Sequence, residues 1–200
     1  LPLPGRHNVS NALGAAAAAM ALGVGIEKIA AGLEAFQPCP GRMELLELSG
    51  DIVVLEDSYN ANPLSVHAAL DALHDLGSSG RRIAVLADML ELGVTAPELH
   101  HQIGKIAAKR VDWLFTYGSL AEKITQGAID AGLPPARVFV ARNHDELIAR
   151  LLELLQPGDR VLVKGSRGMR MEKVTAALRI SMQKTAAPAS AAPAAIVNSD

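Results

Sequence analysis

The sequence predicts a doubly wound α/β domain built on a mostly parallel sheet. From residue 42 onward, short apolar runs rich in β-branched residues alternate with amphipathic helical patterns. Unbroken apolar strands separated by helices are typical of a parallel sheet whose two faces are both covered. The length of 200 residues and the apolar fraction of 50% suffice for one such domain with a core of its own and an appendage.

Residues 1–41 form the appendage, which holds two helical patterns and then a break. The first helix is expected to be capped by Asn8 or Ser10. Its small side chains form a narrow face suited to close packing, at Ala12, Ala15, Ala16 and Ala19. The second pattern spans residues 26–36, and the sequence QPCPG at 37–41 ends it. Two helices cannot make a core alone, so we expect them to pack on the following domain or on residues outside the chain.

Residues 42–182 contain the alternating pattern itself. The expected strands are residues 43–48, 52–55, 83–87, 113–115, 138–140 and 161–163. The expected helices are residues 63–76, 97–110, 120–131, 145–155 and 171–179. The first strand is expected at the sheet edge, antiparallel to the second across the turn at residues 49–51, while the others run parallel. This arrangement predicts a Rossmann-like domain.

Composition limits what the chain binds and where it works. A net charge of −2 gives no electrostatic footprint for nucleic acid or anionic membranes. No apolar run approaches the roughly 20 residues that a membrane-spanning helix requires. A single cysteine, Cys39, excludes an internal disulfide and fits a reducing compartment. We therefore expect a cytoplasmic protein with no nucleic-acid partner and no membrane insertion, and we expect a monomer.

The first residue and the last 18 residues of the chain each support a prediction. The chain opens on Leu1 rather than Met, which favours a segment of a longer protein. Residues 183–200 are rich in Ala, Pro and Ser and have almost no large apolar side chains. Such a composition cannot bury enough surface to order itself, so we expect a disordered tail.

Polar and charged residues gather where the expected strands end. In an open α/β sheet, ligands bind in the crevice beyond the carboxyl ends of the strands. The stretch after residues 161–163 is the densest, with Lys164, Ser166, Arg167 and Arg170 beside two glycines. Glycines admit a close backbone approach and the cations add charge, so the pattern favours an anion site. The alternative, a capped turn with solvated arginines, stays open.

Several common kinds of site are missing from the pattern. The chain has neither the G-x-x-x-x-G-K-[ST] sequence of a Walker A loop nor a G-x-G-x-x-G sequence. If the protein uses ATP, the main phosphate cradle therefore lies outside these residues. No His or Cys cluster has zinc spacing, and we expect no metal ligands in the chain. Cys39, flanked by prolines, is expected to be a hinge residue without chemistry.

Five motifs, in order, resemble those of the Mur ligase family. They are GRHNVSNA at residues 5–12, PGRME at 40–44, DSYNANP at 57–63, DMLELG at 88–93 and KGSRGMRME at 164–172. The motif at residues 57–63 is most similar to its form in the ligases of this family that add D-alanyl-D-alanine. Sister ligases often carry histidine in place of the pair Tyr59-Asn60. The resemblance implies that residues 1–41 are the last helices of a central ATPase domain and residues 42–182 the carboxy-terminal domain.

The resemblance also implies a reaction. It is the ATP-dependent joining of D-alanyl-D-alanine to UDP-N-acetylmuramoyl-tripeptide in peptidoglycan synthesis, through an acyl phosphate. Mg²⁺ would accompany ATP, with its ligands outside this chain. Because the first domain and the P-loop are also outside it, the chain alone is not expected to catalyse ligation.

The resemblance assigns roles residue by residue. Asn8 and Asn11 would hydrogen-bond the adenine, and an Asn amide offers both a donor and an acceptor. Asp57 would bind the ribose hydroxyls, and Arg42 would meet the γ-phosphate once the domains close. Tyr59 and Asn60 would line the nucleotide or the incoming dipeptide, and Asn62 would contact the substrate. The acceptor site, where the dipeptide carboxylate needs a cation, would be faced by Lys164, Ser166 and Arg167. Arg42 and Lys164 are the candidate catalytic residues.

Two alternative functions stay open beside this interpretation. One is another ligase of the same superfamily, such as a folylpolyglutamate synthetase-like or cyanophycin-type enzyme; the pair Tyr59-Asn60 argues against it. The other is a nucleotide-binding module without catalysis. The two helices of residues 1–41, which have no core of their own, argue against that module.

Overall fold

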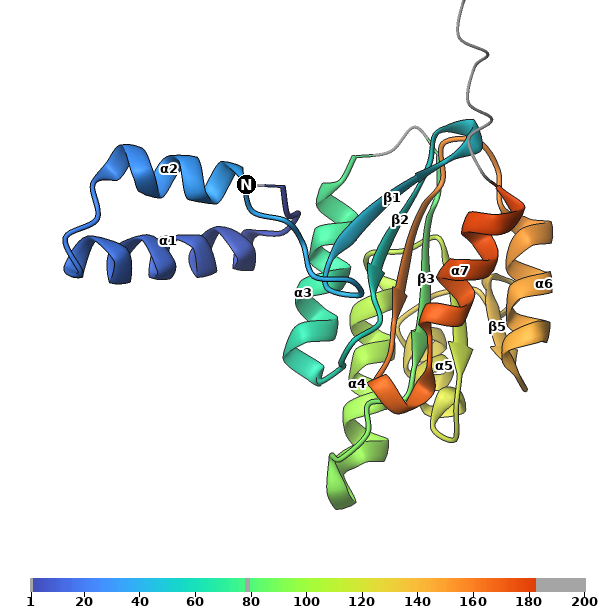
Figure 1. Ribbon diagram of the computed structural model, residues 1–200. Helices are drawn as coiled ribbons and strands as arrows, with labels where there is room; N and C mark the ends of the chain where they lie inside the picture. Colours follow the sequence, from blue (N-terminus) through green and yellow to red (C-terminus); the bar gives the residue numbers. More distant parts are fainter. Residues whose placement is uncertain (1, 78–79, 183–200) are drawn as a thin grey trace, which may run out of the picture.

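A computed structural model describes residues 2–77 and 80–182 of the chain. Figure 1 shows a central sheet with helices on both faces and a helical arm that projects from one side. The tail expected at residues 183–200 lies outside the described residues. No helix within the described ranges is long and apolar enough to cross a membrane.

Within residues 2–77 and 80–182, the sheet has six strands in the order β1-β2-β6-β3-β4-β5. Their bounds are β1 Glu44–Leu48, β2 Ile52–Asp57, β3 Arg82–Ala87, β4 Trp113–Tyr117, β5 Val138–Ala141 and β6 Arg160–Lys164. β1 runs antiparallel to β2, with Leu48 opposite Ile52, and all other pairs are parallel. The predicted Rossmann-like α/β fold with an antiparallel edge strand is therefore confirmed.

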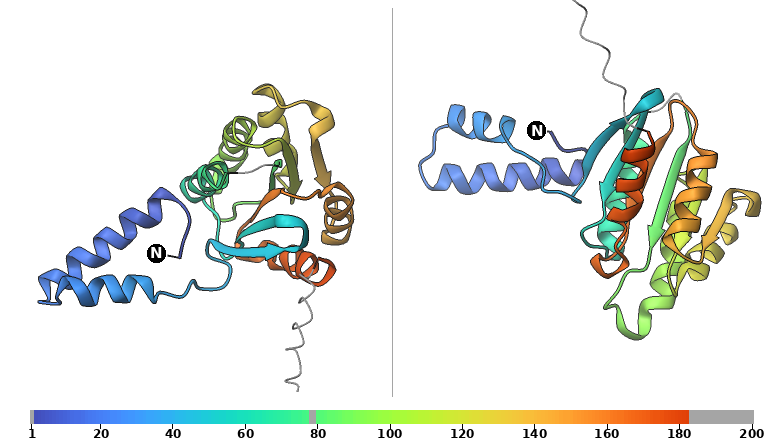
Figure 2. Two further views of the ribbon diagram at one scale, coloured as in Figure 1. Left: turned by 90° about the horizontal axis from the view of Figure 1, so that it is seen from above. Right: turned by 45° about the vertical axis from the view of Figure 1, so that its right-hand side comes forward.

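Five helices cover the two faces of the sheet. They are α3 Pro63–Asp75, α4 Ala96–Ala108, α5 Ala121–Asp130, α6 His144–Leu154 and α7 Glu172–Ser181. The first three cover one face, and α6 and α7 cover the other (Figure 2). Short 3-10 turns occupy Ser49–Asp51, Gly93–Thr95, Pro135–Arg137 and Arg167–Met169.

Strand side chains alternate between two separate apolar cores. On β2, Leu55 joins the core under α3, α4 and α5, while its neighbour Val54 joins the core under α6 and α7. On β6, Leu162 and Val163 divide in the same way. Successive strand side chains point to opposite faces, so a strand buried on both sides must be apolar throughout. This is why each run in the sequence is unbroken.

The arm consists of α1 Arg6–Ala21 and α2 Ile26–Glu34. The expectation that Asn8 or Ser10 caps the first helix is wrong, because Gly5 occupies the N-cap and both residues lie inside the helix. In its place, Asn8 Nδ2 donates a hydrogen bond to the Pro4 carbonyl, 2.7 Å away, just before the helix.

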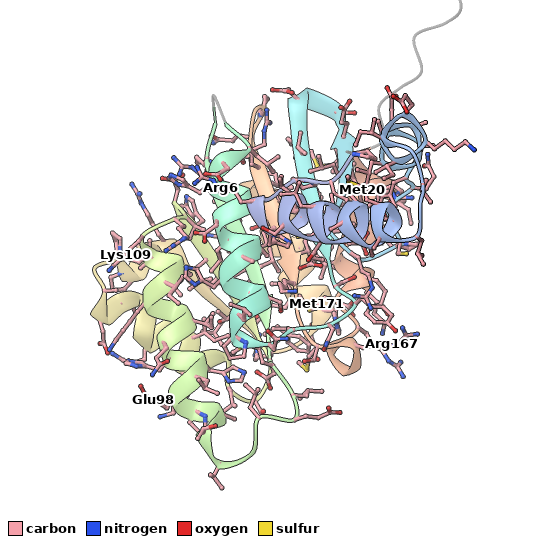
Figure 3. All side chains as sticks on the ribbon, turned by 90° about the vertical axis from the view of Figure 1, so that its left-hand side faces the viewer. Arg6, Met20, Glu98, Lys109, Arg167 and Met171 are labelled. Atoms are coloured by element: carbon pink, nitrogen blue, oxygen red, sulfur yellow. The ribbon has the colours of Figure 1, made fainter. Side chains whose placement is uncertain are left out.

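The arm touches the α/β part mainly at one end. Figure 3 shows Arg6 at the end of α1 that lies beside α3, with Met20 at the opposite end. An exposed ion pair joins Arg6 to Asp75 at 3.6 Å. Much of the arm's apolar surface stays uncovered, and Leu13 and Leu22 are 66% and 84% exposed.

Candidate functional site

A cavity of about 530 Å³ lies between the arm and the carboxyl ends of β2 and β6. Eight of the side chains predicted for the site line it: Asn8, Asn11, Arg42, Asp57, Tyr59, Asn60, Asn62 and Lys164. The lining also includes residues to which no role was assigned, namely Leu3, His7, Ala12, Ala15, Leu33, Phe36, Cys39, Met43 and Ser65. The fold thus brings together the arm, the linker and two strand ends.

A buried ion pair forms the floor of the cavity. Asp57 and Lys164 end β2 and β6 and are cross-strand partners in the parallel ladder. Lys164 Nζ lies 2.6 Å from Asp57 Oδ2 and donates to the carbonyl of Asn60 at 2.7 Å. Lys164 is 1% exposed. Its burial lowers the pKa of the Lys164 ammonium, while the Asp57 carboxylate opposes that shift.

Arg42 stands in a linker that is tied to the exit of β2 on both sides. The Met43 backbone N–H donates to Asp57 Oδ1 at 3.3 Å, and the Tyr59 N–H donates to the Gly41 carbonyl at 3.0 Å. Gly41 and Met43 both have left-handed backbone conformations, with φ of 69° and 54°. A side chain at Gly41 would be strained in that conformation and would come within 3.1 Å of Ser58 Oγ. The linker is therefore held to the sheet from Gly41 onward.

Tyr59 carries two arginines on its ring. The guanidinium carbon of Arg42 lies 4.0 Å from the ring centroid, and that of Arg167 lies 4.9 Å from it. Both distances are within the range of cation–π attraction. Arg167 is exposed and does not line the cavity itself, so Tyr59 is what connects it to the cavity rim.

The loop after β2 is shaped by its two asparagines. Asn60 Oδ1 accepts from the Ala61 N–H at 2.9 Å. Asn62 caps α3: its Oδ1 accepts from the Ser65 N–H at 2.8 Å, and Ser65 Oγ in turn accepts from the Asn62 N–H at 3.0 Å. This reciprocal capping box, followed by proline at the first helical position, fixes where α3 begins. Asn62 thus has a structural task in addition to its place on the cavity wall.

The arm supplies the opposite wall. Asn8 is 8% exposed, and Asn11 Nδ2 donates to Asn8 Oδ1 at 3.4 Å. Leu33 and Phe36 add an apolar surface beside these amides. Both apolar residues fall in the helical pattern expected at residues 26–36, although α2 ends at Glu34 and Phe36 lies just beyond it. Apolar residues in such a pattern also fit ordinary packing, so they do not by themselves indicate a site.

Ser166 is a loop anchor and does not line the cavity. It is 4% exposed, and its Oγ accepts from the Leu90 N–H at 2.9 Å and donates to the Ala61 carbonyl at 3.4 Å. It therefore joins the loops that follow β2, β3 and β6. Cys39, expected to be a hinge without chemistry, is exposed and lines the cavity.

The chain matches one protein family over most of its length. The family described as "Mur ligase, glutamate ligase domain" matches residues 41–167. The chain is 37% identical over 181 residues to the UDP-N-acetylmuramoyl-tripeptide--D-alanyl-D-alanine ligase of Escherichia coli (strain K12), covering 90% of the chain. The chain spans 38% of the length of the curated relatives it matches.

Solved structures agree with this match. MurF from Acinetobacter baumannii superposes with a TM-score of 0.79 at 34% identity, covering 89% of the chain and 39% of that structure. MurF from Thermotoga maritima, solved in complex with ADP, superposes with a TM-score of 0.66 at 25% identity, covering 82% of the chain and 36% of that structure.

Proposed function

Because the chain belongs to the Mur ligase family, we propose that it is the carboxy-terminal part of a ligase that uses ATP to join D-alanyl-D-alanine to UDP-N-acetylmuramoyl-tripeptide in peptidoglycan synthesis. The names of its curated relatives support the substrates, and the ADP complex of the Thermotoga maritima protein supports the nucleotide. The observation that carries the proposal is the cavity, where polar residues of the arm face those of two strand ends.

The arm side of the cavity suits a nucleobase. Leu33 and Phe36 offer apolar surface for the flat ring. Within the described residues, the side-chain amide of Asn11 makes one hydrogen bond, from Nδ2 to Asn8 Oδ1, which leaves the side-chain oxygen and one side-chain N–H for a ligand. The edge of adenine needs a donor and an acceptor side by side. We therefore assign the base to Asn11, with Asn8 beside it as the residue that holds the Asn11 amide in place.

The floor of the cavity suits the ribose. Each carboxylate oxygen of Asp57 accepts one hydrogen bond, from Met43 and from Lys164 respectively, and keeps a further lone pair. The ribose hydroxyls would donate to these lone pairs. Lys164 holds the Asp57 carboxylate fixed in direction through its contact with Oδ2, so its part in the site is exerted through Asp57.

The rim of the cavity suits anions. Arg42 would meet the γ-phosphate of ATP, and Arg167 would meet the carboxylate of D-alanyl-D-alanine. A guanidinium group offers several N–H donors in a planar fork, which matches both groups. Tyr59, Asn60 and Asn62 would line the path between them. Ser166 would act by holding the loop that carries Arg167.

The proposed reaction has two steps. A carboxylate oxygen of the tripeptide attacks the γ-phosphorus of ATP, the bond to the bridging oxygen breaks, and ADP leaves. The amine nitrogen of the dipeptide then attacks the acyl carbon, the bond to the phosphate oxygen breaks, and phosphate leaves as the amide forms and the nitrogen releases a proton. No side chain forms a covalent bond, so the residues of this chain contribute positioning and charge stabilisation.

Mg²⁺ would accompany ATP, but the residues of this chain do not fit it. Among the described residues that line the cavity, Asp57 is the one acidic side chain, and it is paired with Lys164. Within residues 2–77 and 80–182, no group of three or more His, Cys, Asp or Glu is placed to hold a metal. We therefore place the Mg²⁺ ligands outside the chain and assign no step here to the ion.

The proposal includes a division of the chain. Residues 1–41 would be the last helices of the central ATP-binding domain, and residues 42–182 the carboxy-terminal domain. The exposed apolar side chains of the arm support this division, because they need a partner outside the chain. We further propose that the whole ligase works in the cytoplasm as a monomer and that this chain alone does not ligate.

The test uses a ligase of the length of the relatives that carries this chain at its carboxy terminus. With ATP, UDP-N-acetylmuramoyl-tripeptide and D-alanyl-D-alanine, mass spectrometry should show a product heavier by the dipeptide less one water, with one phosphate released per amide. L-Glutamate in place of the dipeptide is the control and should give no product. Product with glutamate and none with the dipeptide would overturn the proposal.

A further inference from the structure

The ring of Tyr59 holds together two cations that come from distant parts of the chain. Arg42 lies in the linker before β1, and Arg167 lies in the 3-10 turn after β6. Their guanidinium carbons are 4.0 Å and 4.9 Å from the centroid of the same ring. The backbone of Tyr59 adds a tie, since its N–H donates to the Gly41 carbonyl at 3.0 Å.

No carboxylate of the described residues is paired with either of the two guanidinium groups. Among residues 2–77 and 80–182, neither Arg42 nor Arg167 forms an ion pair with a carboxylate. The positive potential around them is felt nearby, because Arg42 helps to lower the pKa of Lys164 after the larger effect of burial. Two like charges at one rim repel each other, so something must offset that repulsion.

An aromatic ring is suited to that task in a way that a carboxylate is not. The negative face of the ring attracts a cation, while all N–H donors of the guanidinium remain available for another partner. An aspartate or glutamate at the same place would occupy those donors and cancel the charge. A ring therefore holds cations in place and leaves them ready for an incoming anion.

We propose that Tyr59 is a positioning residue whose ring, and not its hydroxyl group, holds Arg42 and Arg167 side by side for the two anionic groups of the reaction. The inference rests on the proposed function and deepens it. The ring sets the spacing between the cation for the terminal phosphate and the cation for the dipeptide carboxylate. The dipeptide amine is thereby presented close to the acyl group that it attacks.

The first test uses the 200-residue chain itself and needs no catalysis. In NMR spectra, the side-chain N–H and Cδ–H signals of Arg42 and Arg167 should carry ring-current shifts from Tyr59, with assignments made from Arg42→Lys and Arg167→Lys. Tyr59→Leu should remove these shifts and Tyr59→Phe should keep them. Tyr117→Leu is the matched control, since that ring packs at a tilt against His144 instead. Arginine signals that do not move in Tyr59→Leu would overturn the inference.

The second test measures kinetics in the longer ligase. Tyr59→Leu should lower kcat/KM for D-alanyl-D-alanine by about 5- to 30-fold, and Tyr59→Phe should stay within about twofold of the unsubstituted enzyme. Added to Arg42→Ala and Arg167→Ala together, Tyr59→Leu should have little further effect, because its action passes through those side chains. A Phe variant as impaired as the Leu variant, or a full Leu effect in the absence of both arginines, would overturn the inference.

The two proposals fail in different ways. If the proposed function is wrong, the unsubstituted ligase forms no amide with D-alanyl-D-alanine while the ring-current shifts remain. If the role of Tyr59 is wrong, the ligase forms its product and Tyr59→Leu does not change the rate. Alternatively, the NMR signals of the two arginines stay in place in Tyr59→Leu.

Discussion

Arg42 is the residue for which the proposed function makes the sharpest prediction. Its backbone is tied to the exit of β2 by the contacts of Gly41 and Met43, and its side chain reaches the cavity between the arm and the sheet. Under the proposed function, it would meet the γ-phosphate when the domains close, and that contact would strengthen as charge shifts during phosphoryl transfer. The side chain would then contribute more to the transition state than to ATP binding.

We expect Arg42→Ala in the longer ligase to lower kcat by roughly 10²- to 10³-fold and to change KM for ATP far less. Arg42→Lys should rescue only part of the loss, because a point charge does not reproduce the planar fork. Steady-state kinetics decide this. Arg6→Ala is the matched control, since Arg6 is an exposed arginine of the arm outside this cavity. An unchanged kcat in Arg42→Ala would remove Arg42 from the site.

The ion pair under the cavity leads to a second prediction at this scale. Lys164→Met leaves the Asp57 carboxylate largely buried without its cation, so we expect a loss of about 3 kcal/mol in the free energy of unfolding. The double variant Lys164→Met, Asp57→Leu removes both charges and should recover much of that loss. Urea titration of the original chain, the single variant and the double variant measures these free energies of unfolding. A single variant as stable as the original chain would contradict the prediction.

At the residue scale, the sequence indicated where side chains lie better than which groups they contact. Strand ends placed Asp57 and Lys164 on the same rim, and they do line one cavity. The partners of Ser166 could not be predicted, because Leu90 and Ala61 come from other loops and no local pattern connects them to it. The binding roles of these residues stay predictions.

Elements were predicted closely where apolar periodicity is strong. The expected second strand at residues 52–55 is observed as Ile52–Asp57, two residues longer. The cap of α1 was predicted wrongly because Asn is favoured at an N-cap, whereas Gly5 with a φ of 95° provides the turn into the helix without a side-chain bond. The place of β6 between β2 and β3 was not predicted, since strand order depends on how helices pass over the sheet.

The contact between α4 and α5 depends on two glycines. A Cβ atom added to Gly104 would lie 1.9 Å from the Ile124 carbonyl oxygen, and one added to Gly127 would lie 1.9 Å from that of His101. These are backbone atoms and cannot move aside without parting the helices. We expect Gly104→Ala to destabilise the fold by about 2 kcal/mol or more. Gly14→Ala, in the open arm helix, is the control and should be neutral or stabilising in thermal unfolding.

The starts of β3 and β6 are joined by a buried carboxylate. Asp159 is 1% exposed and accepts hydrogen bonds from the Arg81 backbone and side chain. Burial alone would raise the pKa of Asp159, but the bonds from Arg81 and from the Gln156 N–H outweigh it and lower the pKa below its usual value. The carboxylate therefore stabilises the fold fully above the unfolded pKa of about 4, and this contribution is lost as the pH falls through the lower folded pKa.

Asp159→Asn should accordingly reduce the free energy of unfolding at pH 7 by about 2 kcal/mol. The difference between the two chains should shrink as the pH falls below about 4. Urea unfolding at a series of pH values measures it. A difference that stays constant between pH 7 and pH 3 would show that the charge of Asp159 contributes nothing.

On the scale of the whole molecule, the arm is held far less firmly than the sheet. The buried residues of its two helices are Asn8 and Ile29, whereas β6 is buried along nearly its whole length. Hydrogen exchange should therefore give α1 and α2 much lower protection than residues 161–163. Equal protection in the two regions would mean that the arm and the sheet unfold together.

Under the proposed function, the cavity of this chain would be only part of a nucleotide site, which sets the expected affinity. It would offer contacts for a base, a ribose and one edge of the phosphates, and the sequence has no P-loop for the remaining phosphate contacts. We expect calorimetry of the chain with ATP to show weak or undetectable binding. A micromolar Kd would place most of the binding energy within this cavity.

The central position of β6 has a consequence for synthesis on the ribosome. β6 is the last strand of the described residues, yet it separates β2 from β3 and supplies Lys164 under the cavity. The contacts that hold the sheet together thus join residues that are far apart in the sequence and are synthesised at different times. Proteins with many such long-range contacts fold slowly. Until its final strand emerges, the nascent domain holds two unjoined halves with exposed strand edges, and a chaperone that shields such edges would be needed most at that moment.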